Sequence, residues 1–199
     1  IRLLRRAYRL APPVLSFSHA MRSGSAVLQA AAPIMRSVAE KHHINVGLAA
    51  PDRDEMVYLE SIRYNRRVAL RNVVSGQRVP IELTSLGRAY LAVAPDEVRR
   101  ELMAWFRQRR RAQWSTLASE IQAALDNIRQ YGYCTASWQP EVVALSAPLK
   151  SPNNPLVVNV SVSTTTPLHQ IERELAPMLL DLVSRIDKAI VSSEPDTAR

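Results

Sequence analysis

The sequence predicts an α+β domain in which helices cover an antiparallel or mixed six-stranded sheet. In some segments apolar residues recur with helical spacing, and in others they alternate with polar residues as in a strand. Taken in order, these segments predict a helix, three strands, further helices, three strands and a final helix. Strands grouped in this way, with helices between and after them, are typical of a sheet covered by helices.

The bulk composition predicts a globular chain from a reducing compartment. The chain has 199 residues, of which 47% are hydrophobic, enough for one large domain or two small ones. No apolar run approaches the roughly 18 residues that cross a membrane, and the start lacks a signal-peptide pattern. The single cysteine, Cys134, excludes a disulfide within the chain and favours a cytoplasmic location. The net charge of +8 is concentrated in arginine clusters within residues 1–10 and 107–111.

The first half of the chain predicts a linker, a helix and three strands. Residues 12–18 are interpreted as a linker, because Pro12 and Pro13 oppose both helix and strand pairing. Helical spacing follows over residues 19–42, where Pro33 is expected to kink or split the helix. The predicted strands are 44–50, 55–62 and 67–74, the first two forming a hairpin.

The second half predicts three helices, three strands and a final helix. The predicted helices cover residues 82–93, 94–108, 115–133 and 167–190, and the predicted strands cover 133–137, 141–147 and 156–163. Gly87 is expected to permit close approach of another backbone. The helix at 115 is expected to start with a capping box of Ser115 or Thr116 with Glu120, and to stop at Gly132.

The stretch "LVVNVSVST" places valines on one face of a strand and small polar residues on the other. Side chains alternate between faces, so Val158, Val160 and Val162 face a core. The polar row comprises Asn159, Ser161 and Ser163. From the residues alone this row faces either solvent or a small polar cavity.

Catalytic and metal-binding patterns are not found in the sequence. The four histidines are His19, His42, His43 and His169, and none has the spacing of a metal site. Cys134 has no local base, and the five glycines are scattered rather than forming a phosphate loop. The sequence therefore favours a protein that is not an enzyme and predicts no cofactor and no metal.

Several motifs occur in the order seen in IclR-type transcriptional regulators, which the chain resembles over nearly its whole length. The most diagnostic is "GQRVP" followed by "TSLGRAYLA", and "AAPIMRSVAEKHHINVGLAA", "EMVYLESI" and "NIRQYGY" accompany it. The block looks especially like the branch that senses aromatic acids. The resemblance implies a GAF-like effector-binding and oligomerisation domain over residues 21–191, after the end of a wing at 1–10 and a linker at 11–20. Residues 192–199 are expected to be a flexible tail, and the absence of an initial Met agrees with a fragment lacking its winged helix-turn-helix.

The resemblance also implies a set of binding residues. The expected effector-binding residues are Val68, Arg71, Val79, Ser85, Leu86, Ala144, Ser161 and Ser163, and the expected DNA-proximal residues are Arg5, Arg6 and Arg9. The implied effector is a small carboxylate, with aromatic acids among the candidates. The implied partners are operator DNA, through the missing domain, and further copies in a homodimer or homotetramer.

The sequence departs from the family pattern at two places. Arg71 stands where small or apolar residues are usual, and it either grips a carboxylate in the pocket or points to solvent. Thr135 or Ala136 replaces an acidic residue, which leaves a non-carboxylate effector open. An oligomerisation module with a non-functional pocket and an enzyme with a dispersed site are the alternative interpretations, and activation and repression are not distinguished.

Overall fold

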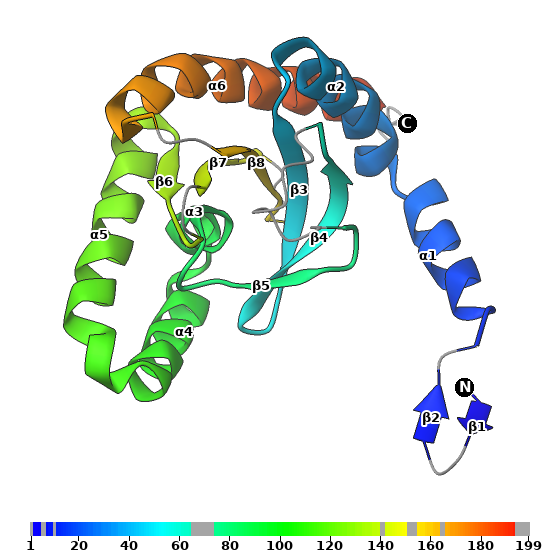
Figure 1. Cartoon of the computed structure of the whole chain (residues 1–199), viewed down its shortest axis with the longest axis horizontal. Helices are drawn as coiled ribbons and strands as arrows, with labels where there is room; N and C mark the ends of the chain where they lie inside the picture. Colours follow the sequence, from blue (N-terminus) through cyan, green and yellow to red (C-terminus); the bar gives the residue numbers. More distant parts are fainter. Residues whose placement is uncertain are drawn as a thin grey trace, which may run out of the picture.

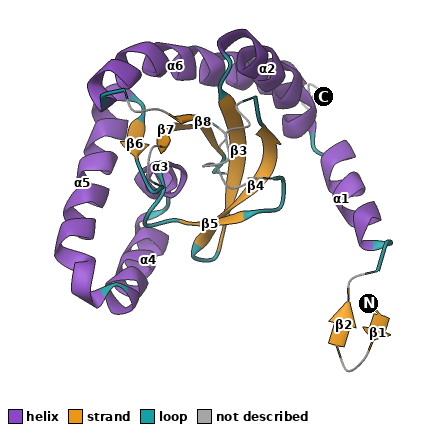
Figure 2. Ribbon diagram, viewed as in Figure 1, coloured by secondary structure: helices purple, strands orange, loops and turns teal. Residues whose placement is uncertain are grey.

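The computed structural model of the chain describes residues 2–4, 7–9, 11–64, 74–139, 142–150, 155–163 and 166–193, with the backbone alone for the residues before 10, Ser163 and Ser193. The described parts form a curled sheet, with helices along its outer face and at its open side (Figures 1 and 2). A small hairpin of β1 (Arg2–Leu4) and β2 (Ala7–Arg9) stands apart from this body at the N-terminal end.

The main sheet has six strands in the order β5-β4-β3-β8-β7-β6, and every pairing in it is antiparallel. The strands are β3 (Asn45–Asp52), β4 (Glu55–Ile62), β5 (Arg78–Pro80), β6 (Cys134–Ala136), β7 (Val142–Pro148) and β8 (Val157–Ser163). The predicted α+β class is thus confirmed, in its antiparallel form. Short β5 was not predicted, while the predicted strand 67–74 lies, except for its last residue, outside the described residues.

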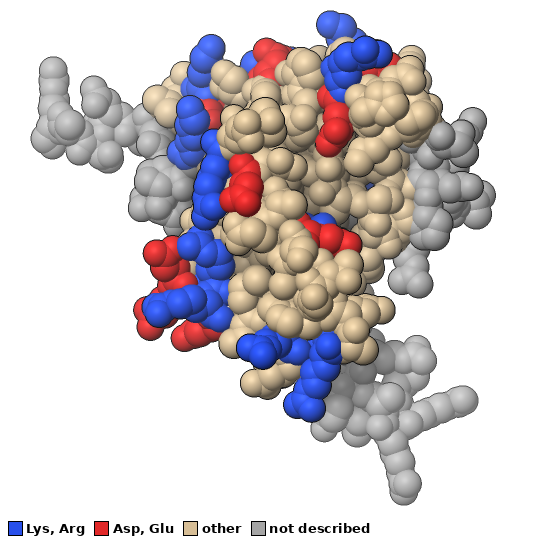
Figure 3. Space-filling view, turned by 90° about the vertical axis from the view of Figure 1, so that its left-hand side faces the viewer, with Lys and Arg blue, Asp and Glu red and all other residues tan. Residues whose placement is uncertain are grey.

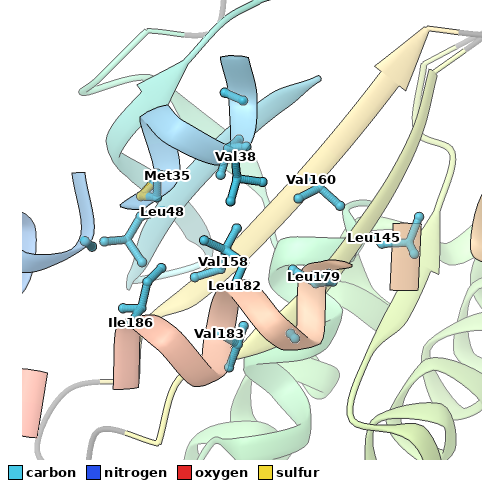
Figure 4. Close-up of a cluster of buried hydrophobic side chains, with 14 of the residues drawn as sticks. Met35, Val38, Leu48, Leu145, Val158, Val160, Leu179, Leu182, Val183 and Ile186 are labelled. Atoms are coloured by element: carbon cyan, nitrogen blue, oxygen red, sulfur yellow. The ribbon is translucent and has the colours of Figure 1, made fainter. Parts of the chain in front are cut away.

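The outer face of the sheet is covered by α2 (Ala26–His42) and α6 (Leu168–Ser193). Val158 and Val160 of β8 are fully buried there, and Val162 packs at the edge of the same core. Leu48 and Leu145 come from the neighbouring strands, and Leu179, Leu182 and Ile186 come from α6 (Figure 4). The valine face of "LVVNVSVST" therefore packs under the covering helices, as predicted.

The inner face of the curl holds α3 (Ser85–Val93), backed by α4 (Asp96–Arg109) and α5 (Trp114–Tyr131). A second core lies here and contains Met56, Val79, Leu86, Phe106 and Ile121. Gly87 faces the backbone of Ile81 so closely that a Cβ at Gly87 would overlap it. This confirms the close approach expected at Gly87, and it draws the start of α3 down onto the strand edge.

The prediction at Pro12 and Pro13 was wrong, and so was the alternative that Pro33 splits its helix. The segment 12–18 is not a helix-free linker, because α1 (Val14–Ser23) begins directly after Pro12 and Pro13. N–H groups at the start of a helix have no partner within it, so a proline there loses no hydrogen bond. The carbonyls of both prolines accept N–H groups of α1. The helix break falls at Gly24 and Ser25 rather than at Pro33, which lies inside α2 on its exposed side, where water can hydrate the carbonyl left without a donor.

The capping box predicted for the helix near residue 115 was also wrong. Helix α5 begins at Trp114, and its cap residue Gln113 makes no side-chain cap hydrogen bond. Glu120 instead pairs with Arg88 of α3, at 2.6 Å. The C-terminal stop is as predicted, with Gly132 in the left-handed conformation at φ 82°.

Charged side chains are distributed over the outside of the helices. On the side of the molecule that includes α4 and α5, basic side chains gather along one edge with acidic ones beside them (Figure 3), and the basic residues of these two helices are all arginines. Within the arginine cluster 107–111, Arg109 pairs with Asp54 and Arg110 pairs with the fully buried Glu82. No helix among the described residues is long and apolar enough to cross a membrane.

Candidate functional site

A cavity of about 70 Å³ lies between the inner face of the sheet and the start of α3. Each enclosed water needs about 10–15 Å³, so the space suits several waters or one small ligand. The lining residues are Tyr58, Arg63, Val79, Thr84, Ser85, Leu86, Ala136, Trp138, Gln139, Val142, Ala144, Asn159 and Ser161. They come from β4, β5, the start of α3, β6, β7, β8 and the segments that follow β4 and β6, so segments distant in the sequence assemble the site.

Five of the eight residues predicted for effector binding meet in this cavity. They are Val79, Ser85, Leu86, Ala144 and Ser161. Val68 and Arg71 lie outside the described residues. Ser163 lies opposite Val142 in the strand ladder, but its side chain is outside the described part of the chain. The same limit applies to the DNA-proximal prediction, because Arg5 and Arg6 are not described and Arg9 is described only by its backbone.

The N-terminus of α3 contributes backbone donors to the cavity. Thr84 caps the helix, and its hydroxyl accepts the N–H of Gly87 at 3.2 Å while donating to the carbonyl of Pro80 at 2.8 Å. The N–H groups of Ser85 and Leu86 have no acceptor within the helix, because first-turn N–H groups point out of its end. This end also carries the positive part of the helix dipole, which favours an anion.

The polar face of β8 looks into the same cavity. Asn159 and Ser161 line it and are 5% and 8% exposed. Next to Asn159 in the ladder, Ser146 of β7 donates a hydrogen bond to the Ser85 hydroxyl at 2.8 Å. The small polar residues that the sequence placed opposite the valines therefore line a cavity at Asn159 and Ser161 instead of facing bulk water.

Tyr58 lies over Gly47 of β3, the strand between β4 and β8. An added Cβ at Gly47 would lie 2.5 Å from Cε1 of Tyr58, and it would also overlap Oδ1 of Asn159. Burial raises the pKa of the Tyr58 phenol to about 12, against the attraction of Arg63 and a hydrogen bond from Asn159, which both lower it. Tyr58 is thus a neutral phenol at physiological pH. Its ring packs against the sheet at Gly47, where the absence of a side chain leaves room for it.

Sequence reasoning did not identify Tyr58, Arg63, Thr84 or Trp138 as residues of the site. Asn159 was recognised as part of the polar row but was not included among the binding residues. Arg63 follows directly after the predicted strand 55–62, and this position at a strand end was the available signal. The sequence suggested Arg71 as the basic group, and among the described residues Arg63 is the arginine that lines the cavity.

The inner face does not present a catalytic nucleophile at Cys134. Its thiol is buried, lies 3.4 Å from the carbonyl of Ser85, and has its pKa raised to about 12 by burial despite the attraction of Arg88. A thiol with this pKa stays protonated and is a poor nucleophile. Across the described residues, no group of three or more His, Cys, Asp or Glu side chains is placed to hold a metal ion.

Comparison with known proteins places this fold among transcriptional regulators. The profile of the family described as "Bacterial transcriptional regulator IclR C-terminal" matches residues 19–188. The Pca regulon regulatory protein of Pseudomonas putida is 24% identical over 181 residues, which cover 88% of this chain. The HTH-type transcriptional regulator TsaQ1/TsaQ2 of Comamonas testosteroni is 26% identical over 171 residues, or 83% of this chain. The chain spans 62% of the length of each of these curated relatives.

Solved structures agree with this assignment. An IclR family transcriptional regulator from Brucella abortus superposes with a TM-score of 0.80 at 28% identity, covering 92% of this chain and 70% of that one. An IclR homolog from Microbacterium hydrocarbonoxydans, solved in complex with 4-hydroxybenzoate, superposes with a TM-score of 0.72 at 19% identity. The superposition covers 92% of this chain and 76% of that one. The relatives are regulators, in agreement with the prediction of a protein that is not an enzyme. The chain belongs to the IclR family of bacterial transcriptional regulators and carries the C-terminal domain of that family.

Proposed function

We propose that this domain binds a small carboxylate effector in the cavity beside α3. The observation that carries the proposal is the convergence of helix-end N–H groups and hydroxyls on one partly open cavity, namely those of Ser85, Leu86 and Ser161. Backbone N–H groups at a helix start and hydroxyl groups are the donors that proteins use to bind carboxylates. Apolar walls, formed in part by Val79 and Ala144, would hold the body of the ligand.

The comparisons support this proposal at the level of the family. The structurally similar IclR homolog from Microbacterium hydrocarbonoxydans was solved with 4-hydroxybenzoate, an aromatic carboxylate. We extend that ligand class to this chain, with short aliphatic acids as further candidates because the cavity is small. Val68, Arg71 and Ser163 remain part of the proposed binding set.

The proposed regulator acts in the cytoplasm on operator DNA through a DNA-binding domain preceding residue 11, with Arg5, Arg6 and Arg9 close to the DNA. Effector binding would shift the equilibrium between two arrangements of a homodimer or homotetramer, by an amount set by its differential affinity for them. Helix α1 would carry this change, because it joins the N-terminal hairpin to α2. The competing function is an oligomerisation module with a non-functional pocket. A cavity that side chains leave unfilled supports effector binding instead.

A thermal-shift screen with short aliphatic and aromatic carboxylates, including 4-hydroxybenzoate, tests the proposal. A ligand at 100 times its Kd stabilises the fold by about 2.7 kcal/mol, which raises Tm by a few degrees. Ser161→Ala and Ser163→Ala should reduce the shift. The matched control is Ser119→Ala on α5, whose hydroxyl bonds to the carbonyl of Ser115 away from the cavity. The absence of a shift with every acid, or an undiminished shift in both cavity variants, would contradict carboxylate binding at this site.

A further inference from the structure

Among the described residues that line the cavity, Arg63 is the single formally charged one. It follows the end of β4 and is half-buried. Within the described residues it takes part in no ion pair or hydrogen bond, whereas arginines such as Arg22, Arg88 and Arg110 each pair with a glutamate. Burial lowers its pKa, and the attraction of the nearby Tyr58 phenol opposes this effect. As far as the structure describes the chain, the cavity therefore contains a partly desolvated cation without a counter-charge, and desolvating an unpaired charge is unfavourable.

The Tyr58 hydroxyl is arranged to act as a second donor beside Arg63. The side chain of Asn159 interacts with this hydroxyl and lowers the Tyr58 pKa, against the larger raising effect of burial. A phenol has one hydrogen to donate, and the buried Oδ1 of Asn159, an acceptor in the same lining, has no hydrogen-bond partner among the described residues, so it does not take this hydrogen. Since the phenol stays protonated up to about pH 12, this hydrogen is available to a ligand throughout the physiological range.

On the opposite wall of the cavity, the Ser85 hydroxyl accepts a hydrogen bond and keeps its own hydrogen for a ligand. The hydroxyl of Ser146 donates to that of Ser85, so the hydrogen of Ser85 is left to donate elsewhere. With the N–H groups of Ser85 and Leu86, donors face the cavity from two sides. The described part of the lining contains no Asp or Glu. An acceptor-rich anion satisfies all these groups at once, and a neutral ligand leaves Arg63 unpaired.

We infer that Arg63 selects the effector by charge, forming an ion pair with its carboxylate while the Tyr58 hydroxyl donates a second hydrogen bond to the same group. The inference rests on the proposed function and adds to it the residue that determines specificity. It also assigns to Arg63 the role that the sequence suggested for Arg71. A site of this kind rejects the neutral amide of an acid that it binds, because the amide brings no negative charge to Arg63.

Two matched ligand pairs test the inference by calorimetric titration of the chain. The pairs are 4-hydroxybenzoate with 4-hydroxybenzamide, and acetate with acetamide, each differing in the charged group. Wild-type protein is expected to prefer the acid by at least tenfold. Arg63→Gln should weaken binding of the acid by at least tenfold and leave binding of the amide nearly unchanged, so that the preference disappears. Arg107→Gln, which removes an exposed arginine of α4 away from the cavity, should behave like the wild type.

The outcomes separate the inference from the proposed function. If an acid binds and Arg63→Gln keeps the preference over the amide, the charge selection by Arg63 is wrong while carboxylate sensing stands. If no acid binds, the carboxylate proposal fails and the inference fails with it. Loss of the preference in Arg63→Gln, with the control unchanged, supports both.

A measurement without ligand tests the premise that Arg63 is unpaired. Replacing an unpaired, half-buried cation by a neutral side chain removes a desolvation penalty. The free Arg63→Gln protein should therefore melt at the same temperature as the wild type or a few degrees above it. A fall in Tm of several degrees would show that Arg63 holds a structural partner in the free domain, and this result would overturn the inference.

Discussion

Tyr58 and Glu60 lie two residues apart on β4, yet their side chains face opposite sides of the sheet. A register shift between Leu48 and Ala49 pairs Tyr58 with Ala49 and Glu60 with Leu48, so Leu59 is the extra residue of a β-bulge. Ala49 belongs to the inner core and Leu48 to the outer one. The bulge thus places Tyr58 in the cavity and Glu60 on the outer face.

Glu60 anchors helix α1 on that outer face. Its buried carboxylate accepts a hydrogen bond from Arg22, near the end of α1, and Arg22 also donates to the carbonyl of Leu59 at 3.3 Å. Glu60→Ala removes the acceptor, and we expect it to lower the free energy of unfolding by about 1–3 kcal/mol, the usual penalty for leaving a partly buried donor unsatisfied. Urea unfolding measures this change, and amide hydrogen exchange should show faster exchange in α1.

The matched control for Glu60→Ala is Asp126→Ala, which breaks the pair with Arg129. Both side chains of that pair are more than half exposed, so we expect a change of less than about 1 kcal/mol. Equal losses of stability in the two variants would contradict the anchoring role of Glu60.

Gly47→Ala should damage the cavity more than the fold. The added methyl group would lie 2.5 Å from Cε1 of Tyr58, so the ring must swing away from the sheet and toward the cavity. We expect a loss of about 1–3 kcal/mol from overpacking, together with loss of any ligand-induced rise in Tm. Gly76→Ala is the contrast, because no atom lies within 4 Å of its added Cβ and its φ of +87° alone makes it unfavourable. A Gly47→Ala protein that keeps its full ligand response would contradict this account.

Gly87→Ala should prevent stable folding. Its added Cβ would overlap backbone atoms of Ile81, which cannot rotate away as a side chain can. We expect a loss of more than about 3 kcal/mol, at the upper end of overpacking effects. Circular dichroism and urea unfolding test this expectation, with Gly24→Ala as the control. The added Cβ at Gly24 would have the carbonyl oxygen of Ala20 as its nearest neighbour, at 3.0 Å. A Gly87→Ala protein of native stability would mean that α3 can move off the strand edge.

Alkaline pH should destabilise the domain through Cys134. Its pKa is raised by burial from 9.0 to about 12, so between these values the unfolded chain loses the thiol proton and the folded chain keeps it. The unfolded state then binds fewer protons, and the free energy of unfolding falls as pH rises above about 9. Urea unfolding at pH 7.5 and 9.5 should show this decline in the wild type and a smaller one in Cys134→Ala. An identical pH dependence in both proteins would exclude the thiol as its source.

Periodicity was sufficient for most elements because it reflects local physics. The alternation in β8 predicted which face the valines bury, and Gly132 and Gly87 marked a helix end and a close packing position. Proline was misread at two places because its effect depends on which hydrogen bond it removes. Pro12 and Pro13 precede a first turn that needs no donor from them, and Pro33 leaves a carbonyl free on a solvent-exposed side.

Local patterns in the sequence were enough to predict the α+β class and the two faces of the strand that carries Asn159 and Ser161. That this polar face lines a cavity, and that Tyr58 and Arg63 line it too, follows from the three-dimensional arrangement of the strands. Strand order places β3 between β4 and β8, the bulge at Leu59 sets which side chains of β4 turn inward, and Gly47 of β3 leaves room for the Tyr58 ring. Pairing register and the placement of a bulge depend on contacts between strands that are distant in the chain, so local periodicity does not contain them.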